Sequence, residues 1–217
     1  MIEYKVIFQK RKSIQIQIIE KDVIVKAPIH TNKEIVDSFV KKKEKWIIET
    51  LNKIDKRVVL AKDEILFNGE VVKKIINVQP FMKRNFVIFD NDKFIINVKK
   101  KEDSEIALRK WLISYAEKNF KEIVAKYEKF FDKKPTSIKI REQKTIWGSC
   151  SYDNKLSFNV KLLLARESAL EYVVVHEMCH MIHKDHSKNF WSLVETIYPK
   201  YKEEERWLKE KGYLLKI

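Results

Sequence analysis

Apolar and polar residues alternate with a period of two along the first thirty residues of the chain. The alternation is rich in β-branched side chains and covers the segments VIFQ (6–9), SIQIQII (13–19) and DVIVKA (22–27). A period of two places every second side chain on one face of an extended backbone, which is typical of half-buried strands. The pattern therefore predicts three short strands.

The period lengthens to near-helical spacing in the next segment, residues 31–54. Its apolar positions are Ile35, Phe39, Trp46, Ile47 and Leu51. Thr31 or Asn32 precedes them, and both residue types favour the N-cap because their side-chain oxygens accept hydrogen bonds from free backbone N–H groups. We expect one helix here.

Short apolar segments separated by turn residues return between residues 64 and 98. They are EILFNGEVV, KKIINV, NFVIF and KFIINV, with the turn signals FNG and DND. Asparagine, aspartate and glycine favour the backbone conformations of tight turns between strands. The first hundred residues are thus predicted to be rich in strands.

Helical spacing dominates the rest of the chain. Apolar residues recur every three or four positions from Asp103 or Ser104 to Phe131, which predicts a long amphipathic helix. Two more helices are predicted over residues 168–183 and 187–212, the second interrupted near Pro199. Before them, strands are predicted in TSIKIREQ (136–143) and, as a short pair, in WGSCSYDNKLSFNV (147–160).

Length and composition describe a globular chain. It has 217 residues, 45% of them hydrophobic, which is enough to bury a core. No apolar run reaches the roughly 18 residues that a membrane span needs, and the N-terminal segment lacks the apolar region of a signal peptide. Two cysteines, Cys150 and Cys179, cannot form a disulfide framework. We expect a cytoplasmic protein without membrane contact, and no pattern indicates an oligomeric state.

The net charge of +14 suggests a nucleic-acid partner, because clustered lysine and arginine attract polyanions. Lysines far outnumber arginines, however, whereas nucleic-acid interfaces rely on arginine for bidentate contacts. A compositional bias of the source genome would produce the same excess of lysine. Nucleic-acid binding is therefore kept as an alternative.

The segment HEMCHMIHKDH (176–186) contains four of the chain's five histidines. His176 and His180 are four positions apart, so on a helix they lie on one face and can bind one zinc ion. Glu177 is rotated by about 100° from His176, which places its carboxylate beside the metal, where it can take a proton from water. The spacing predicts a zinc site with Glu177 as general base.

A catalytic zinc needs a third protein ligand. If the helix continued, His183 would lie about 4.5 Å beyond His180 along its axis, too far to complete a compact set. His186 reaches the metal if the chain reverses at residues 182–185, as in H-E-x-x-H-x-x-G-x-x-H motifs, with His183 in left-handed backbone at the glycine position. We favour His186; the alternatives are Glu195 and one of the residues Glu203 to Glu205.

The C-terminal half resembles the YgjP-like zinc metallopeptidase family, which is related to the SprT-like and WLM metalloproteases. The resemblance is clear from about residue 140 to 207 and extends to the N-terminal segment. Its most specific parts are WGSC (147–150), HEMCH (176–180) and HSKNFW (186–191). It implies zinc on His176, His180 and His186, Glu177 as catalytic acid and base, and a peptide or protein substrate. One departure is Ile146, where the family usually has arginine.

These patterns together predict an α+β fold. A β-rich region with one helix over residues 1–100 is expected to precede a zincin-like metallopeptidase domain over residues 101–217. The predicted function is hydrolysis of peptide bonds by zinc-activated water. Two alternatives remain: a nucleic-acid-associated protein with a zinc site, as SprT-like relatives act on DNA-bound proteins, and a structural zinc with His183 or Cys179 as fourth ligand.

Residues outside the histidine cluster carry further expectations. In WGSC, we expect Gly148 to permit a tight turn and Trp147 to pack in the core. The strand TSIKIREQ is expected to offer a sheet edge beside the zinc to an extended substrate. Tyr198 and Tyr201 are candidates for stabilising an oxyanion.

Overall fold

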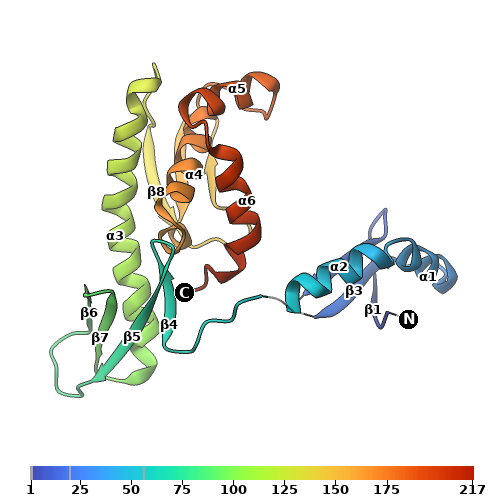
Figure 1. Cartoon of the computed structure of the whole chain (residues 1–217), viewed down its shortest axis with the longest axis horizontal. Helices are drawn as coiled ribbons and strands as arrows, with labels where there is room; N and C mark the ends of the chain where they lie inside the picture. Colours follow the sequence, from blue (N-terminus) through green and yellow to red (C-terminus); the bar gives the residue numbers. More distant parts are fainter. Residues whose placement is uncertain (1, 20, 56) are drawn as a thin grey trace. The chain divides into compact units, whose positions relative to one another are not determined.

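The chain forms two compact units, Met1–Val59 and Leu60–Ile217, in a computed structural model that describes residues 2–19, 21–55 and 57–217 (Figure 1). Each unit has a hydrophobic core of its own. Within these described residues the fold mixes three small sheets with six α-helices. The mixed helical and stranded composition expected from the sequence is confirmed.

The smaller unit consists of a three-stranded sheet followed by two helices. The strands are β1 (Lys5–Gln9), β2 (Gln15–Ile19) and β3 (Asp22–Pro28), and the helices are α1 (Lys33–Lys42) and α2 (Glu44–Asp55). The strand order is β1-β3-β2, with β1 parallel and β2 antiparallel to the central strand. Alternate residues of β3 and one face of the helices form the core: Val23, Val25, Ala27, Val36, Val40 and Ile47.

The single helix expected over residues 31–54 is two helices. Asn32 caps the first, since its side chain accepts a hydrogen bond from the backbone N–H of Glu34. Lys43 then leaves helical geometry, with φ −103° and ψ 5°, and separates the two helices. The buried positions Val36, Val40 and Ile47 nevertheless keep helical spacing across this break. The apolar face assigned from the sequence was wrong at two positions, because Ile35 and Trp46, each next to a buried residue, are 56% and 46% exposed.

The larger unit begins with a four-stranded sheet. Its strands are β4 (Glu64–Phe67), β5 (Glu70–Val78), β6 (Phe86–Asp90) and β7 (Lys93–Val98), in the order β4-β5-β7-β6. The two central strands are parallel, and each pairs with an antiparallel edge strand. Both expected turns are confirmed, since the positive φ angles fall at Asn68, Gly69, Asn91 and Asp92.

This sheet shares one core with the helices that follow it. The turn between β4 and β5 is fixed to a later segment, because the N–H groups of Asn68 and Gly69 donate to the carbonyl groups of Leu163 and Leu164 at 2.9 and 3.2 Å. The ring of Trp111 also packs at 5.2 Å from that of Phe94. The division between the compact units therefore lies before the sheet, whereas the sequence suggested a boundary after it.

Four helices and a second three-stranded sheet complete the larger unit. The helices are α3 (Ser104–Tyr127), α4 (Glu167–Cys179), α5 (Lys188–Ile197) and α6 (Tyr201–Lys211), and the strands are β8 (Ser137–Arg141), β9 (Gly148–Cys150) and β10 (Lys155–Asn159). Helix α4 lies between α3 and α6 and also contacts β9 (Figure 1). Among the described helices, none has the length and hydrophobicity needed to cross a membrane.

Candidate metal centre and active site

The last turn of α4 and the residue that ends it carry the first part of the candidate site. His176 and Glu177 lie inside the helix, which ends at Cys179. His180 occupies the C-cap position and still has near-helical angles, with its N–H donating to the His176 carbonyl at 3.3 Å. The two histidines therefore remain one helical turn apart, although the helix ends earlier than the sequence suggested.

A tight reversal follows and brings the chain back toward α4. The N–H groups of Ile182 and His183 both donate to the carbonyl of Cys179 at 3.0 Å, and α5 begins after the N-cap residue Ser187. The expected left-handed backbone at His183 was wrong: in the described part of the chain, His183 is not among the residues with positive φ. Successive backbone hydrogen bonds make this turn.

Three imidazole rings converge where the chain reverses. His176, His180 and His186 each offer a ring nitrogen, and these atoms lie within 4.8 Å of one another. Nε2 of His176 and Nε2 of His186 are 3.1 Å apart. Two nitrogens bound to one tetrahedral zinc at about 2.0–2.1 Å lie about 3.3 Å apart, so these rings fit a zinc ion. Within the described residues, the alternative ligands His183 and Glu195 lie outside this cluster.

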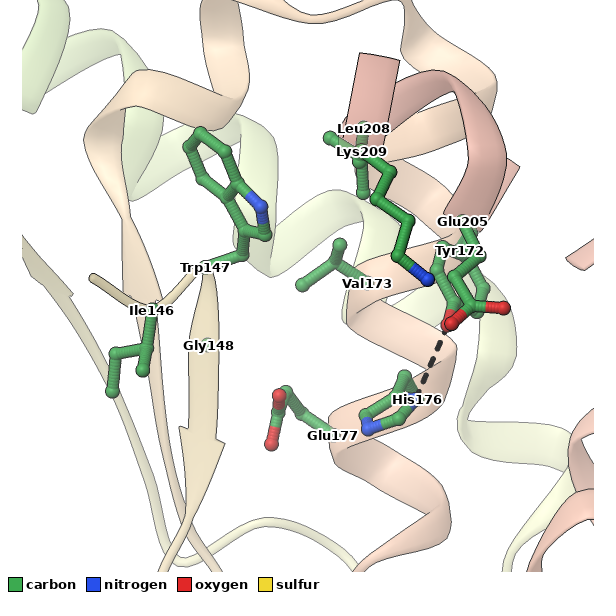
Figure 2. A pocket seen from close by; sticks show the side chains of 10 residues that line it. All are labelled: Ile146, Trp147, Gly148, Tyr172, Val173, His176, Glu177, Glu205, Leu208 and Lys209. Carbon is green, nitrogen blue, oxygen red and sulfur yellow. Dashed lines mark hydrogen bonds between the residues drawn. The ribbon is translucent and has the colours of Figure 1, made fainter. Parts of the chain in front are cut away.

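Neighbouring groups orient the rings. Nδ1 of His180 lies 2.9 Å from the carbonyl oxygen of His183. A carbonyl can only accept a hydrogen bond, so Nδ1 carries the proton and Nε2 is left free for a metal. Figure 2 shows the contact between the hydroxyl of Tyr172 and Nδ1 of His176, whose atoms are 3.5 Å apart. Phe190 stacks on the ring of His180 with centroids 4.4 Å apart.

Burial keeps the first histidine neutral. Desolvation, with smaller contributions from His180 and His186, lowers the pKa of His176 to about 3. Desolvation also lowers the pKa of His180. Metal ligation requires the unprotonated imidazole, so these two rings need not lose a proton to bind a metal near neutral pH.

Glu177 is buried beside the cluster, and a glycine makes the space for it. The residue is 6% exposed, and desolvation raises its pKa to about 7. A Cβ at Gly148 would lie 2.7 Å from Cγ of Glu177 and 2.9 Å from its Oε1. Gly148 begins β9 and pairs with Phe158, so the tight turn expected there was wrong. The glycine is explained by a contact with a residue far along the chain.

A cavity of about 330 Å³ opens beside His176 and Glu177 (Figure 2). Trp147 lines it and also packs against the core, as expected from the sequence. Tyr198 is not among the residues that line it, and its hydroxyl donates to the Ser168 carbonyl at 2.9 Å. Tyr201 is buried against Trp191. Tyr172 lines the cavity, and its position four residues before His176 was the signal that could have identified it.

The sheet edge beside Glu177 belongs to β9. The strand order is β8-β10-β9, so β10 separates the two edge strands. Helix α4 contacts β9, and Gly148 in β9 faces Glu177. The expectation that TSIKIREQ, which contains β8, supplies the edge next to the site was therefore wrong.

Lys184 joins the reversal to the turn between β9 and β10. Its Nζ donates to the carbonyl of Ser151 at 2.9 Å and to Oδ1 of Asn154 at 2.8 Å. The same nitrogen lies 3.8 Å from Sγ of Cys150. The loop that carries His186 is thus tied to the strand that faces Glu177, and no periodic pattern in the sequence indicates this link.

Comparison with known proteins identifies the family. The model of a family described as YgjP-like, metallopeptidase domain, matches residues 12–211. No curated protein matches the chain. A solved structure with some similarity is the crystal structure of the metallopeptidase zymogen of Pyrococcus abyssi abylysin, with 20% identity and a TM-score of 0.38 over 42% of this chain and 93% of that one. Since the family model spans nearly the whole chain, including the histidine cluster, the chain belongs to the YgjP-like metallopeptidase family.

Proposed function

We propose that this metallopeptidase is a zinc-dependent peptidase with a zincin-like catalytic domain. In this proposal His176, His180 and His186 hold the zinc, and Glu177 is the general base. The observation that carries it is the convergence of the three ring nitrogens within 4.8 Å, with the buried Glu177 carboxylate beside them.

The donor set suits zinc. Imidazole nitrogens are common zinc ligands, and three protein ligands leave one coordination position for water or substrate. When bound, zinc would lower the pKa of water and polarise the scissile carbonyl group. The ligand rings already have hydrogen bonds that orient them, through the His183 carbonyl and the Tyr172 hydroxyl.

Glu177 would move the proton. Its carboxylate takes a proton from water as the oxygen bonds to the carbonyl carbon, and it gives that proton to the leaving nitrogen as the C–N bond breaks. A general acid and base works best when its pKa lies near the working pH, and burial raises the pKa of Glu177 to about 7. The space left by Gly148 allows the carboxylate to stay in this buried position.

The free edge of β9 would hold the substrate. An extended peptide can add to an exposed sheet edge through backbone hydrogen bonds. Strand β9 is an edge of its sheet and lies next to Glu177, so a peptide bound there would pass the general base. Backbone pairing of this kind accepts many sequences, and selectivity then comes from side-chain pockets.

The geometry favours this function over a structural zinc. A closed structural site needs four ligands, for which His183 or Cys179 was the candidate. In the described residues the cluster contains neither of them, and Cys179 is fully buried in the core. A three-ligand arrangement is the one expected for catalysis.

The substitution Glu177→Gln tests the proposal. The variant should bind one zinc per chain like the wild type, while cleavage of an unfolded protein such as casein falls about 10²–10⁴-fold. Glu167→Gln, an exposed glutamate in the first turn of the same helix, is the matched control and should cleave normally. Normal cleavage by Glu177→Gln would show that the base is another group, and a zinc-loaded wild type that cleaves nothing would refute the peptidase proposal.

A further inference from the structure

The cavity beside the candidate site shares residues with that site. His176 and Glu177 line it, together with residues of α6 and the segment that leads into β9 (Figure 2). Its volume of about 330 Å³ lies at the lower end of the range for small-molecule pockets, about 300–1,000 Å³. A space of this size suits one large side chain rather than several residues.

The walls of the cavity are mainly apolar. Ile146, Trp147, Val173 and Leu208 line it, and they come from three different elements of the chain. Val173 and Leu208 are buried, whereas Ile146 is 44% exposed. A large apolar side chain placed against these walls would remove apolar surface from water, both its own and that of Ile146. This burial favours binding.

The charged residues of the cavity do not select a charged ligand. Glu205 and Lys209 lie four positions apart on α6, are exposed and have opposite charges, so their fields largely cancel. A charged side chain that entered deeply would have to give up water beside the buried Glu177, which costs free energy unless a partner compensates.

We propose that this cavity is the subsite that sets cleavage specificity, and that it takes a large uncharged apolar side chain, such as leucine, methionine or phenylalanine, next to the cleaved bond. The inference rests on the proposed peptidase function. Side chains of an extended peptide point alternately to opposite faces, so a peptide on the β9 edge presents one side chain near Glu177 to the cavity. The preference is therefore expected at a single substrate position.

The affinity of small hydroxamates tests the inference without any cleavage. A hydroxamate binds zinc directly, and two series of compounds place one side chain on either side of this group. With zinc-loaded wild type, leucine and phenylalanine side chains should bind at least tenfold more tightly than lysine and aspartate in one of the two series, measured by calorimetry. Equal affinities in both series, or no binding by protein shown to hold zinc, would overturn the inference.

Substitution of a residue that lines the cavity tests whether the side-chain preference arises there. Ile146→Glu should weaken binding of the leucine compound at least tenfold and reduce its advantage over the lysine compound. Ile88→Glu is the matched control, since Ile88 is 46% exposed and lies on β6, outside the residues that line the cavity. Unchanged selectivity in Ile146→Glu would count against the cavity.

Cleavage of a random peptide mixture separates the two proposals. If the wild type cleaves peptides with no side-chain preference at either position next to the cut, the subsite is refuted and the peptidase stands. If the hydroxamates bind selectively but no peptide is cleaved, the peptidase proposal fails, and the cavity is an apolar binding site with no role in cleavage.

Discussion

Adding one methyl group at Gly148 should displace Glu177 without touching the three histidines proposed as metal ligands. Gly148 has no positive φ, so alanine can adopt its backbone conformation, and the effect comes from the new Cβ alone. That atom would lie 2.7 Å from Cγ and 3.0 Å from Cδ of Glu177. Alanine therefore forces Glu177, the proposed general base, to move.

The size of the effect follows from this distance. Carbon atoms pack at about 3.5–4.0 Å, so the Glu177 side chain must shift by about 1 Å. A displacement of about 1 Å in a catalytic group costs about 10²-fold in rate. The overpacking should also lower the free energy of unfolding by about 1–3 kcal/mol.

Three measurements on Gly148→Ala check the reasoning. The value of kcat/KM should fall about 10²-fold, zinc affinity in competition with a chelator should stay within about threefold of wild type, and Tm should fall by about 2–12 °C. Ser149→Ala, at the next position of β9, is the control and should leave all three nearly unchanged.

Two results would refute this explanation of the glycine. Activity within about twofold of wild type would show that Glu177 is not the base or that its position is not critical. A parallel loss of zinc would show that the added methyl group disturbs the histidine cluster rather than the carboxylate.

Three further predictions concern the metal, pH and the loop. His186→Ala should weaken zinc binding at least 10²-fold while His183→Ala leaves it unchanged; equal losses would mean that the third ligand is wrongly assigned. Because burial raises the pKa of Glu177 from 4.5 to about 7, its contribution to the stability of the metal-free fold is present below pH 4.5 and is lost as pH rises through 7. The free energy of unfolding of the wild type should therefore fall by about 3 kcal/mol relative to that of Glu177→Gln between about pH 4 and 8. Urea unfolding in the presence of a chelator measures it, and a difference that stays constant with pH would contradict the prediction. Lys184→Met should lower Tm by about 2–4 °C through loss of its hydrogen bonds to the β9–β10 turn, whereas Lys188→Met, its exposed control, should not.

Local patterns in the sequence were sufficient for much of the fold. The strands between residues 64 and 98 have short apolar segments and turn residues with special backbone angles, and both are read from neighbouring positions. The long helix α3 has a sustained apolar stripe and ends within a few residues of the expected position. The convergence of His186 with His176 also followed from spacing, because ten residues suffice for a helix end and one reversal.

The features that were missed depend on contacts between distant residues. Nothing near Gly148 indicates that Glu177 fills the space beside it, since the two are brought together by packing of β9 on α4. The break at Lys43 has no proline or glycine to signal it. The buried face of α1 and α2 passes through Val36, Val40 and Ile47, which pack on the strands of the smaller unit, so spacing alone did not separate it from the neighbouring Ile35 and Trp46. The boundary of the larger unit depends on the hydrogen bonds from the β4–β5 turn to residues 163 and 164, which no local pattern encodes.

The part played by His183 has a consequence for how sequence variation in this enzyme should be interpreted. Its backbone makes two hydrogen bonds here: the N–H donates to the Cys179 carbonyl, and the carbonyl lies 2.9 Å from Nδ1 of His180. Its φ is not positive, so the turn sets no demand for glycine. Every residue type except proline, which lacks the N–H, can supply the same two groups. These two hydrogen bonds therefore do not require a histidine at position 183, and a histidine found there in a sequence comparison is no sign of a fourth metal ligand.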